Sequence, residues 1–140
     1  MKSRPHWFYV QSAVVPYRLV GGSLEVLLIT SRGGKRWTIP KGLVEHGMTA
    51  AASAAKEAYE EAGVRGDVGD VALGSYEYEK WGGTCAVEVY AMRVTEVLDD
   101  WPESRRRRRW LSLDEAASAL ETDGPRRMLA ALADRLRGEG

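Results

Sequence analysis

Residues 56–64 read Lys56-Glu57-Ala58-Tyr59-Glu60-Glu61-Ala62-Gly63-Val64, and they follow the turn Pro40-Lys41-Gly42 at the distance of about one helix. Glu57, Glu60 and Glu61 have the spacing i, i+3 and i+4. On an α-helix this spacing keeps the carboxylates within roughly 100° of arc, so they can converge on one small, hard cation. A solvated helix face carries similar charge runs in many proteins, so the flanking sequence has to decide between the two interpretations.

The sequence before this run favours the metal site. Residues 36–39 predict a short strand, and glycines punctuate the loop from Gly42 onward. Thr49 is a suitable N-cap for an Ala-rich helix, which we expect over Thr49–Ala62 and which Gly63 ends. Strand, glycine loop, acidic helix and glycine stop form one connected unit, which an isolated patch of surface charge does not require.

Residues 42–64 resemble the sequence box of the Nudix hydrolase family. The box has Gly, five residues, Glu, seven residues, Arg-Glu, an apolar residue, any residue, Glu-Glu, any residue, Gly and an apolar residue. Met48 stands where the box has its first Glu, and a thioether cannot replace a carboxylate as a ligand for a hard cation. Lys56 replaces the Arg, which keeps the charge but loses the planar guanidinium. The positions that match are Gly42, Glu57, Ala58, Glu60, Glu61, Gly63 and Val64.

The resemblance implies an α/β fold, namely an α/β/α sandwich with a mixed β-sheet between helices. It also implies Mg²⁺- or Mn²⁺-dependent hydrolysis of a phosphoanhydride bond by water attack at phosphorus. Glu57, Glu60 and Glu61 are then the candidate catalytic and metal-binding acids. Glu57 and Glu61 are expected to bind the metal together with the main-chain carbonyl of Lys41, while Glu60 is the best candidate to orient or deprotonate water. Which of the three acids is the base stays open.

Composition agrees with a compact enzyme. The 140 residues carry 20 basic and 20 acidic side chains and no net charge, so nucleic acid and anionic membranes are not the expected partners. The length predicts one domain over residues 1–140. The single cysteine, Cys85, lies in an alternating run and is expected to be a strand residue, not a nucleophile. Because no segment has the pattern of a membrane span or a signal peptide, we expect a soluble, cytoplasmic protein.

Residue patterns predict strands and helices that alternate only partly, which favours a mixed sheet with helices on both faces. Ser112 and Glu115 form a predicted capping box, and Pro125 suits the first turn of a last helix. We expect strands over residues 8–17, 24–30, 36–39, 71–79, 84–95 and 107–111, and helices over 49–62, 114–120 and 125–136.

The downstream sequence bears on the substrate. Residues 94–110 are similar to the corresponding region of the diphosphoinositol polyphosphate phosphohydrolases, and the similarity extends over most of residues 9–122. It implies inositol pyrophosphates or diadenosine polyphosphates as substrates. A strand through Arg105–Arg109 would send Arg106 and Arg108 to one face, where they could bind polyphosphate; a solvated edge strand explains the run equally well.

Other residues favour a nucleotide. The inositol-specific relatives have basic residues where this chain has Gln11 and the segment 80–84. The turn at Lys41 and Gly42 is similar to diadenosine tetraphosphate hydrolases, and Trp81 could stack on an adenine. We therefore rank dinucleoside polyphosphates and inositol pyrophosphates nearly level. The predicted substrate-binding residues are Lys41, Gly42, Arg36, Arg106 and Arg108.

Two other classes of function stay open. The loss of an acid at Met48 is compatible with a catalytically weak or silent module that binds nucleotides or polyphosphates. The arginine run alone favours nucleic-acid binding or RNA-end processing, which the zero net charge makes the weaker hypothesis. The sequence leaves monomer and homodimer equally open.

Overall fold

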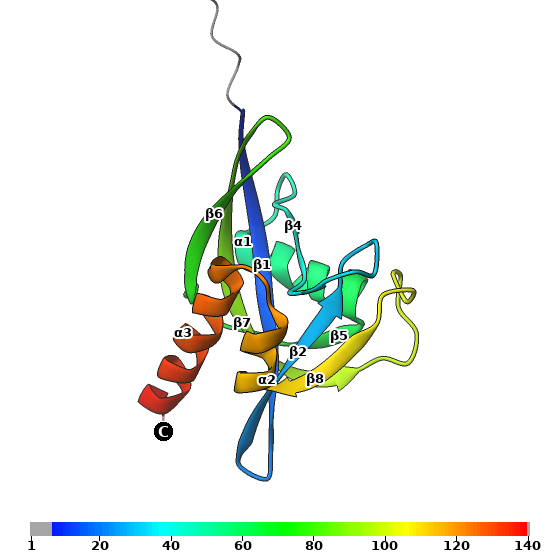
Figure 1. The fold of residues 1–140 in the computed structure, drawn as a ribbon, viewed down its shortest axis with the longest axis vertical. Coiled ribbons are helices and arrows are strands. Elements are labelled where there is room, and N and C mark those ends of the chain that lie inside the picture. Colours follow the sequence, from blue (N-terminus) through cyan, green and yellow to red (C-terminus); the bar gives the residue numbers. More distant parts are fainter. Residues whose placement is uncertain (1–6, 140) are drawn as a thin grey trace, which may run out of the picture.

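The structure is a computed structural model, and it describes residues 7–139. One eight-stranded sheet forms the centre of the molecule, with helices against both of its faces (Figure 1). Its main path has the order β3-β2-β1-β7-β5, while β4 pairs with β1, β6 with β7 and β8 with β2. The strands are β1 (Trp7–Val20), β2 (Ser23–Thr30), β3 (Trp37–Thr38), β4 (Lys41–Leu43), β5 (Val64–Val68), β6 (Gly74–Lys80), β7 (Gly83–Val97) and β8 (Arg108–Ser112).

The sheet is mixed because its two longest strands run in the same direction. β1 and β7 pair in parallel from Trp7↔Gly83 to Tyr17↔Arg93, and the other strand pairs are antiparallel. The helical elements are α1 (Ala50–Glu57), the π-helical turn η1 (Ala58–Ala62), α2 (Leu113–Ala119) and α3 (Asp123–Glu139). α1 and η1 pack on one face of the sheet, and α2 and α3 pack on the other.

Neighbouring residues of the central strands serve opposite faces of the sheet. Val14 and Leu27 lie in the core under α1 and η1, whereas Val15 and Leu28 lie in the core under α2 and α3. Because both faces are covered, these strands read as continuous apolar runs and not as alternating ones. The predicted α/β/α sandwich with a mixed sheet is thereby confirmed.

Most predicted elements form. Thr49 caps α1, its side chain accepting from the Ala52 N–H, and Ser112 and Glu115 form the capping box of α2. Two short strands, β4 and β5, were not expected. β5 contains Gly66, where a Cβ would come within 2.1 Å of the Arg93 carbonyl oxygen, so the close strand pairing itself requires a residue of low strand propensity.

Some predicted boundaries were wrong. The strand expected from residue 71 begins at Gly74, and the last helix begins at Asp123 instead of Pro125. Cys85 is a buried strand residue, as expected. Within residues 7–139, no helix is long and apolar enough to cross a membrane. That residues 1–140 form a single domain stays a prediction.

Candidate active site

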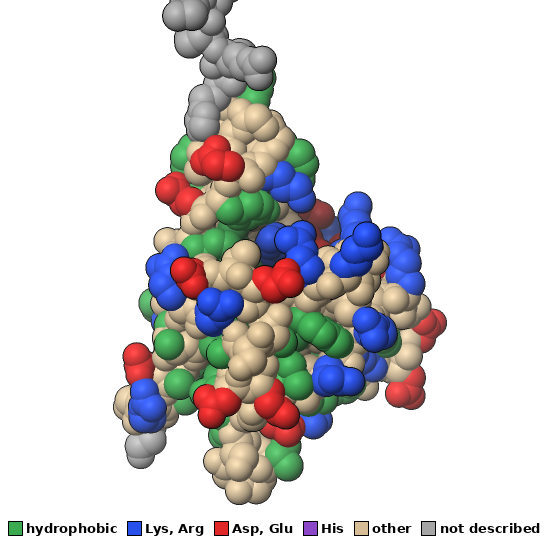
Figure 2. All heavy atoms as spheres, in the orientation of Figure 1, with side chains coloured by type: hydrophobic (Ala, Val, Ile, Leu, Met, Phe, Trp, Pro, Cys, Tyr) green, Lys and Arg blue, Asp and Glu red, His purple; other side chains and the backbone are tan. Residues whose placement is uncertain are grey.

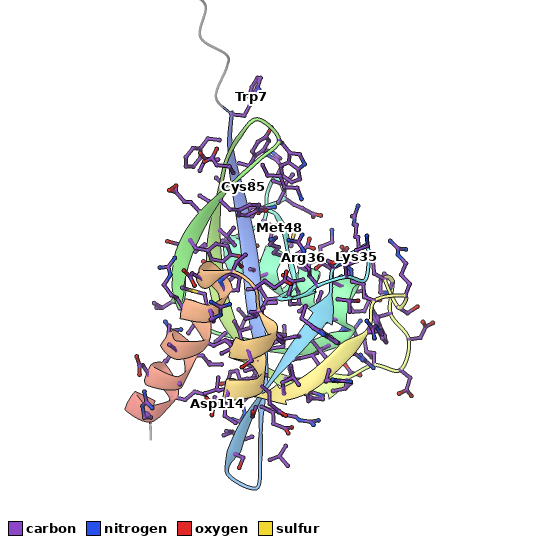
Figure 3. The ribbon with its side chains drawn as sticks, in the orientation of Figure 1. Trp7, Lys35, Arg36, Met48, Cys85 and Asp114 are labelled. Atoms are coloured by element: carbon purple, nitrogen blue, oxygen red, sulfur yellow. The ribbon has the colours of Figure 1, made fainter. Side chains whose placement is uncertain are left out.

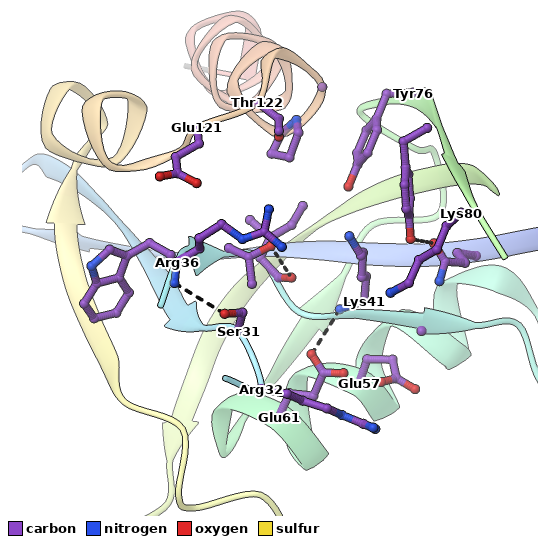
Figure 4. Close-up of a pocket in the computed structure, with 18 of the residues that line it drawn as sticks. Ser31, Arg32, Arg36, Lys41, Glu57, Glu61, Tyr76, Lys80, Glu121 and Thr122 are labelled. Carbon is purple, nitrogen blue, oxygen red and sulfur yellow. Dashed lines mark hydrogen bonds between the residues drawn. The ribbon is translucent and has the colours of Figure 1, made fainter. Parts of the chain in front are cut away.

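One large cleft, of about 1280 Å³, opens beside the sheet where several loops meet. It is lined by the loop between β2 and β3, by β4, by the α1–η1 helix, by the hairpin of β6 and β7, and by the start of α3 (Figure 4). Acidic side chains come from the α1–η1 side, and the other walls carry basic side chains together with further acids, namely Glu77, Glu79, Glu103, Glu121 and Asp123. The cleft therefore joins a place for a cation to places for anions.

Glu57 and Glu61 form the acidic wall. The Glu61 side chain is only 10% exposed, and the Lys41 N–H donates to its Oε1 at 3.3 Å. Burial, followed by a hydrogen bond with Glu57, raises the pKa of the Glu61 carboxyl to about 8. Burial also raises the pKa of Glu57. A Cβ at Gly42 would lie 2.5 Å from the Glu57 carboxyl group, so only glycine allows the turn to lie so close to this acid.

The helix changes its winding at the acidic residues. The chain is α-helical to Glu57 and π-helical over Ala58–Ala62, after which Gly63 ends it at φ 65°. A π-turn holds more residues than an α-turn, so it brings residues four apart nearly into line and turns those three apart away from each other. Glu57 and Glu61 therefore approach, while Glu60 lies 3.7 Å from Lys56 Nζ.

The expected convergence of three carboxylates is thus not formed in this structure. Across residues 7–139, no three Asp, Glu, His or Cys side chains come together as a ready metal-binding group. The physical reason is the change from α to π winding, which the predicted continuous α-helix over Thr49–Ala62 did not include. Glu57 and Glu61 remain paired, and the assignment of Glu60 as base stays a prediction.

The loop before α1 is held by an acid that the box does not specify. Glu45 Oε1 lies 2.6 Å from Lys56 Nζ, and the Glu45 N–H donates to Ser53 Oγ at 3.2 Å. Met48 follows in the same loop (Figure 3), where its N–H donates to the Glu45 carbonyl. Lys56 therefore has a carboxylate partner in Glu45, although position 48 carries Met where the box has Glu.

Basic residues form the opposite wall. Lys41 Nζ lies 4.5 Å from the centroid of the Tyr78 ring, and the Tyr78 hydroxyl donates to Gln11 Oε1 at 2.6 Å. Burial, then the charge of Lys80, lowers the pKa of Lys41. Arg36 reaches into the same space (Figure 4). Cations placed so close together repel one another, and an anion between them would relieve that repulsion.

Arg106 and Arg108 lie in different surroundings, and the substrate-binding role predicted for both stays a prediction. The strand predicted over residues 107–111 forms as β8, which begins at Arg108, whereas Arg106 lies before it in a turn where its N–H donates to the Glu103 carbonyl. The Arg106 side chain is buried at the cleft, 3.0 Å from Glu103 and 3.8 Å from Glu61. It is therefore placed to hold these two acids.

Arg108 lies outside the residues that line the cleft. Its guanidinium donates to the carbonyls of Ala62, Gly63 and Leu98, and it lies over the Trp101 ring at 3.9 Å. These contacts use the side chain to fix the C-terminal end of η1. In this arrangement the Arg108 side chain serves the packing of η1 against the loop before β8.

Glu103 is a residue of this site that sequence reasoning missed. Its N–H donates to the Glu60 carbonyl at 2.9 Å, and its carboxylate lines the cleft next to Arg106. It comes from the loop between β7 and β8, far from the helix in sequence. The available signal was its place in residues 94–110, the region similar to the diphosphoinositol polyphosphate phosphohydrolases.

The acidic wall fits a divalent cation. Two carboxylates lie side by side, one of them nearly buried, and this arrangement favours protonation only while no positive charge lies between them. Carboxylate and carbonyl oxygens are the ligands that Mg²⁺ and Mn²⁺ prefer. Glu57, Glu61 and the main chain of Lys41 would hold such an ion.

Comparison with known proteins identifies the family. A family model described as the NUDIX domain matches residues 10–132. The chain belongs to the Nudix hydrolase family. It is 33% identical over 144 residues to Nudix hydrolase 12, mitochondrial, of Arabidopsis thaliana, an alignment covering 87% of this chain and 71% of that protein. The predicted assignment to an enzyme family of Nudix hydrolases is confirmed.

A second relative bears on the branch. Diphosphoinositol polyphosphate phosphohydrolase 2 of Rattus norvegicus is 38% identical over 105 residues, covering 72% of this chain and 57% of that protein. The chain thus spans between about half and three quarters of the length of these two Nudix relatives. A solved structure, the Ap4A hydrolase of C. elegans, superimposes with a TM-score of 0.76 at 24% identity and covers 93% of this chain and 99% of its own. That likeness shows the fold.

Proposed function

We propose that this Nudix hydrolase cleaves a phosphoanhydride bond in a nucleoside or inositol polyphosphate by attack of water at phosphorus, with Mg²⁺ or Mn²⁺ as cofactor. The observation that carries the proposal is the pairing of Glu57 with Glu61 in the same cleft as Lys41 and Arg36. A divalent ion at the two acids would neutralise and polarise the phosphate groups. The name of one relative, diphosphoinositol polyphosphate phosphohydrolase 2, supports a polyphosphate substrate.

The chain's own residues divide the work between them. Lys41, Arg36 and Lys80 are placed to bind phosphate oxygens, and Gly42 lets the turn approach the acids. Phosphoryl transfer requires mainly charge neutralisation and alignment, which this arrangement supplies. The Arg106 guanidinium forms ion pairs with the carboxylates of Glu61 and Glu103 and so holds them in position.

We assign the activation of water to one of the acids on the α1–η1 helix. Glu60 is the candidate general base, because it lies on the same α1–η1 helix as Glu57 and Glu61 and its side chain is 32% exposed, against 10% for Glu61. Lys56 lies between Glu60 and Glu45, with its Nζ 3.7 Å from Glu60 Oε1 and 2.6 Å from Glu45 Oε1. The Glu45–Lys56 pair also holds the loop in which Met48 lies.

The test is an activity screen of the purified protein with Mg²⁺ and with Mn²⁺. The panel holds diadenosine polyphosphates, nucleoside triphosphates, ADP-ribose and inositol pyrophosphates. We expect phosphoanhydride cleavage of at least one of them, abolished by a chelator. Glu57→Gln and Glu61→Gln should each lower kcat/KM by about 100-fold or more, since each removes charge from the centre that stabilises the transition state.

Glu96→Gln is the matched control. Glu96 lies on β7 outside the cleft, half exposed, 3.5 Å from Arg65, and its variant should keep wild-type kinetics. No cleavage of any substrate on the panel, in a folded protein, would refute the proposal. Cytoplasmic location and the choice between monomer and homodimer stay predictions that this screen does not address.

A further inference from the structure

We propose that Trp81 is a stacking platform for the base of a nucleoside polyphosphate, so that nucleotides and not inositol pyrophosphates are the preferred ligands of the cleft. The catalytic consequence rests on the proposed phosphoanhydride hydrolysis, whereas the binding preference can be measured on its own. Trp81 is one of the residues that line the cleft, and it lies in the turn that joins β6 to β7.

The backbone of this turn is unusual. Trp81 has φ 56°, and it is the one residue other than glycine with a positive φ in the described part of the chain. Gly82 follows with φ 70°, and Lys80 pairs with Gly83 across the turn. Two-residue hairpins with positive φ at both central positions favour Asn, Asp or Gly there. A tryptophan at the first position therefore costs folding free energy, and strain of this kind is typical of functional sites.

The indole is also held in place and left accessible. The Tyr9 hydroxyl donates to the Trp81 carbonyl at 3.3 Å, and the two rings meet edge to face with centroids 5.1 Å apart. Even so, Trp81 remains 49% exposed. Large aromatic side chains usually bury most of their surface, so a braced and exposed indole at the rim of a cleft is suited to a flat ligand.

Charge connects this rim to the centre of the cleft. Lys80 Nζ lies 4.6 Å from the centroid of the Trp81 ring, and Lys41 Nζ lies over Tyr78. Tyr78 is three residues from Trp81, which is about 10 Å along a strand. An extended nucleotide spans such a distance with its ribose and first phosphates. Its base would then meet Trp81 while its phosphate chain passes Lys80 and Lys41 toward Glu57 and Glu61.

An inositol pyrophosphate does not use these features equally well. Its ring is saturated and puckered, and it presents phosphates and hydroxyls in every direction with no flat face to stack. Base stacking on an aromatic side chain, by contrast, is favourable with every base. The cations beside Trp81 serve both ligands, so the indole is the part of the site that separates them.

The experiment compares two ligands that differ by the nucleoside. Binding of a nucleoside triphosphate with a methylene bridge and of inorganic tripolyphosphate is measured by calorimetry, with Mg²⁺ and with a chelator. The variants are Trp81→Asn, which suits the turn, and Trp81→Tyr, which keeps an aromatic ring. Trp7→Asn is the matched control, because Trp7 is 58% exposed at the same end of the molecule (Figure 3) but is not among the residues lining the cleft.

We expect Trp81→Asn to weaken nucleotide binding about tenfold and to leave tripolyphosphate binding within about twofold. Trp81→Tyr should restore most of the affinity, and Trp7→Asn should match the wild type for both ligands. The Tm of Trp81→Asn should equal or exceed that of the wild type, because relief of the strained turn offsets the lost contact with Tyr9. The decisive result is a Trp81→Asn protein that keeps the Tm of the wild type and binds the nucleotide more weakly, but binds tripolyphosphate as well as the wild type does.

Three outcomes would overturn the assignment. Equal weakening for both ligands would show that the hairpin positions phosphate and not the base. Unchanged nucleotide binding in Trp81→Asn would show that Trp81 does not stack on the base. Altered sedimentation in both Trp→Asn variants, without any effect on nucleotide binding, would show instead that this end contacts a second copy of the chain. A base preference without hydrolysis of any phosphoanhydride would refute the proposed enzyme activity and leave the role of Trp81 intact.

Discussion

At the scale of single residues, Glu61 connects the packing of the protein to its chemistry. It follows the buried Ala58 by three positions in the π-turn and lies against the main chain of Lys41. The same burial that fixes its position raises its pKa to about 8. The carboxylate is therefore prepared for a cation at a cost to the stability of the metal-free protein.

This cost predicts how the stability of the metal-free protein depends on pH. The unfolded chain loses the proton of Glu61 near pH 4.5, whereas the native protein retains it up to about pH 8. Between these values the native state binds more protons than the unfolded state, so the contribution of Glu61 to the free energy of unfolding falls as the pH rises. We expect Glu61→Gln to lose this contribution. Thermal unfolding in a chelator, from pH 5 to pH 8.5, measures it.

The comparison is between slopes of Tm against pH, because other groups titrate in the same range. Glu96→Gln, which alters an exposed acid, should keep the wild-type slope. A Glu61→Gln protein whose Tm falls with pH as steeply as that of the wild type would show that Glu61 is already ionised in the native state at neutral pH.

At the scale of elements, the helix that carries the acids shows what sequence could and could not predict. Its start at Thr49 and its end at Gly63 were predictable, because N-caps and left-handed glycines act through neighbouring residues. The π-turn between them was not, since it depends on Ala58 and Ala62 packing on the sheet. Pairing of Glu57 with Glu61 could be anticipated from the box, and the separation of Glu60 could not.

The same division holds elsewhere in the site. Lys41 and Gly42 could be placed from the turn they form beside the helix. Glu103 and Arg106 reach the cleft only because the loop before β8 folds back, the Glu103 N–H donating to the Glu60 carbonyl. Contacts between segments more than forty residues apart have no local signal, so the place of Arg106 beside Glu61 and Glu103 needed the structure, although Arg106 itself was among the predicted site residues.

The start of α3 gives a prediction about packing between elements. Gly124 is inside this helix, and a Cβ there would lie 2.5 Å from the Tyr76 ring. Alanine gains up to about 1 kcal/mol over glycine in a helix, whereas overpacking costs about 1–3 kcal/mol. The clash should therefore prevail, and we expect Gly124→Ala to lower the free energy of unfolding by about 1 kcal/mol. Urea denaturation measures the change.

Gly138 offers the matched substitution in the same helix. A Cβ at Gly138 would meet no heavy atom within 4 Å, so Gly138→Ala should be neutral or slightly stabilising. If Gly124→Ala were as stable as Gly138→Ala, the Tyr76 side chain would have room to move. Its part of the cleft wall would then be less rigid than the packing indicates.

At the scale of the whole molecule, charge is balanced in number but not in position. Figure 2 shows Lys and Arg gathered over the loops before β3 and before β8. The exposed members of this basic rim are Arg32, Lys35, Arg36, Arg105, Arg107 and Arg109, and none of them forms a salt bridge with another residue of the described chain. A neutral protein thus presents a local positive field beside its cleft.

This field predicts the effect of salt on catalysis. Charges at the surface attract an anionic substrate over about a Debye length, roughly 10 Å at 0.1 M ionic strength. We expect kcat/KM for a polyphosphate substrate to fall severalfold between about 0.05 and 0.5 M salt, through KM more than kcat. Steady-state kinetics at fixed Mg²⁺ measures the slope.

Two substitutions identify the source of the salt effect. Arg105→Ser removes a cation of the basic rim and should flatten the dependence. Arg137→Ser removes an exposed cation that pairs with Asp134 near the end of α3, and it should leave the dependence unchanged. Equal slopes for all three proteins would show that substrate capture depends on contacts inside the cleft alone.

The acidic helix meets the sheet through the smallest apolar side chains. Ala54, Ala58 and Ala62 are fully buried there, and a methyl group has no rotamer with which to adjust. The helix that carries Glu57 and Glu61 is thus held in one position against the sheet. Any accommodation of differently shaped molecules has to come from the loops and the hairpin around it, so selectivity can diversify in this scaffold while the chemical centre stays where it is.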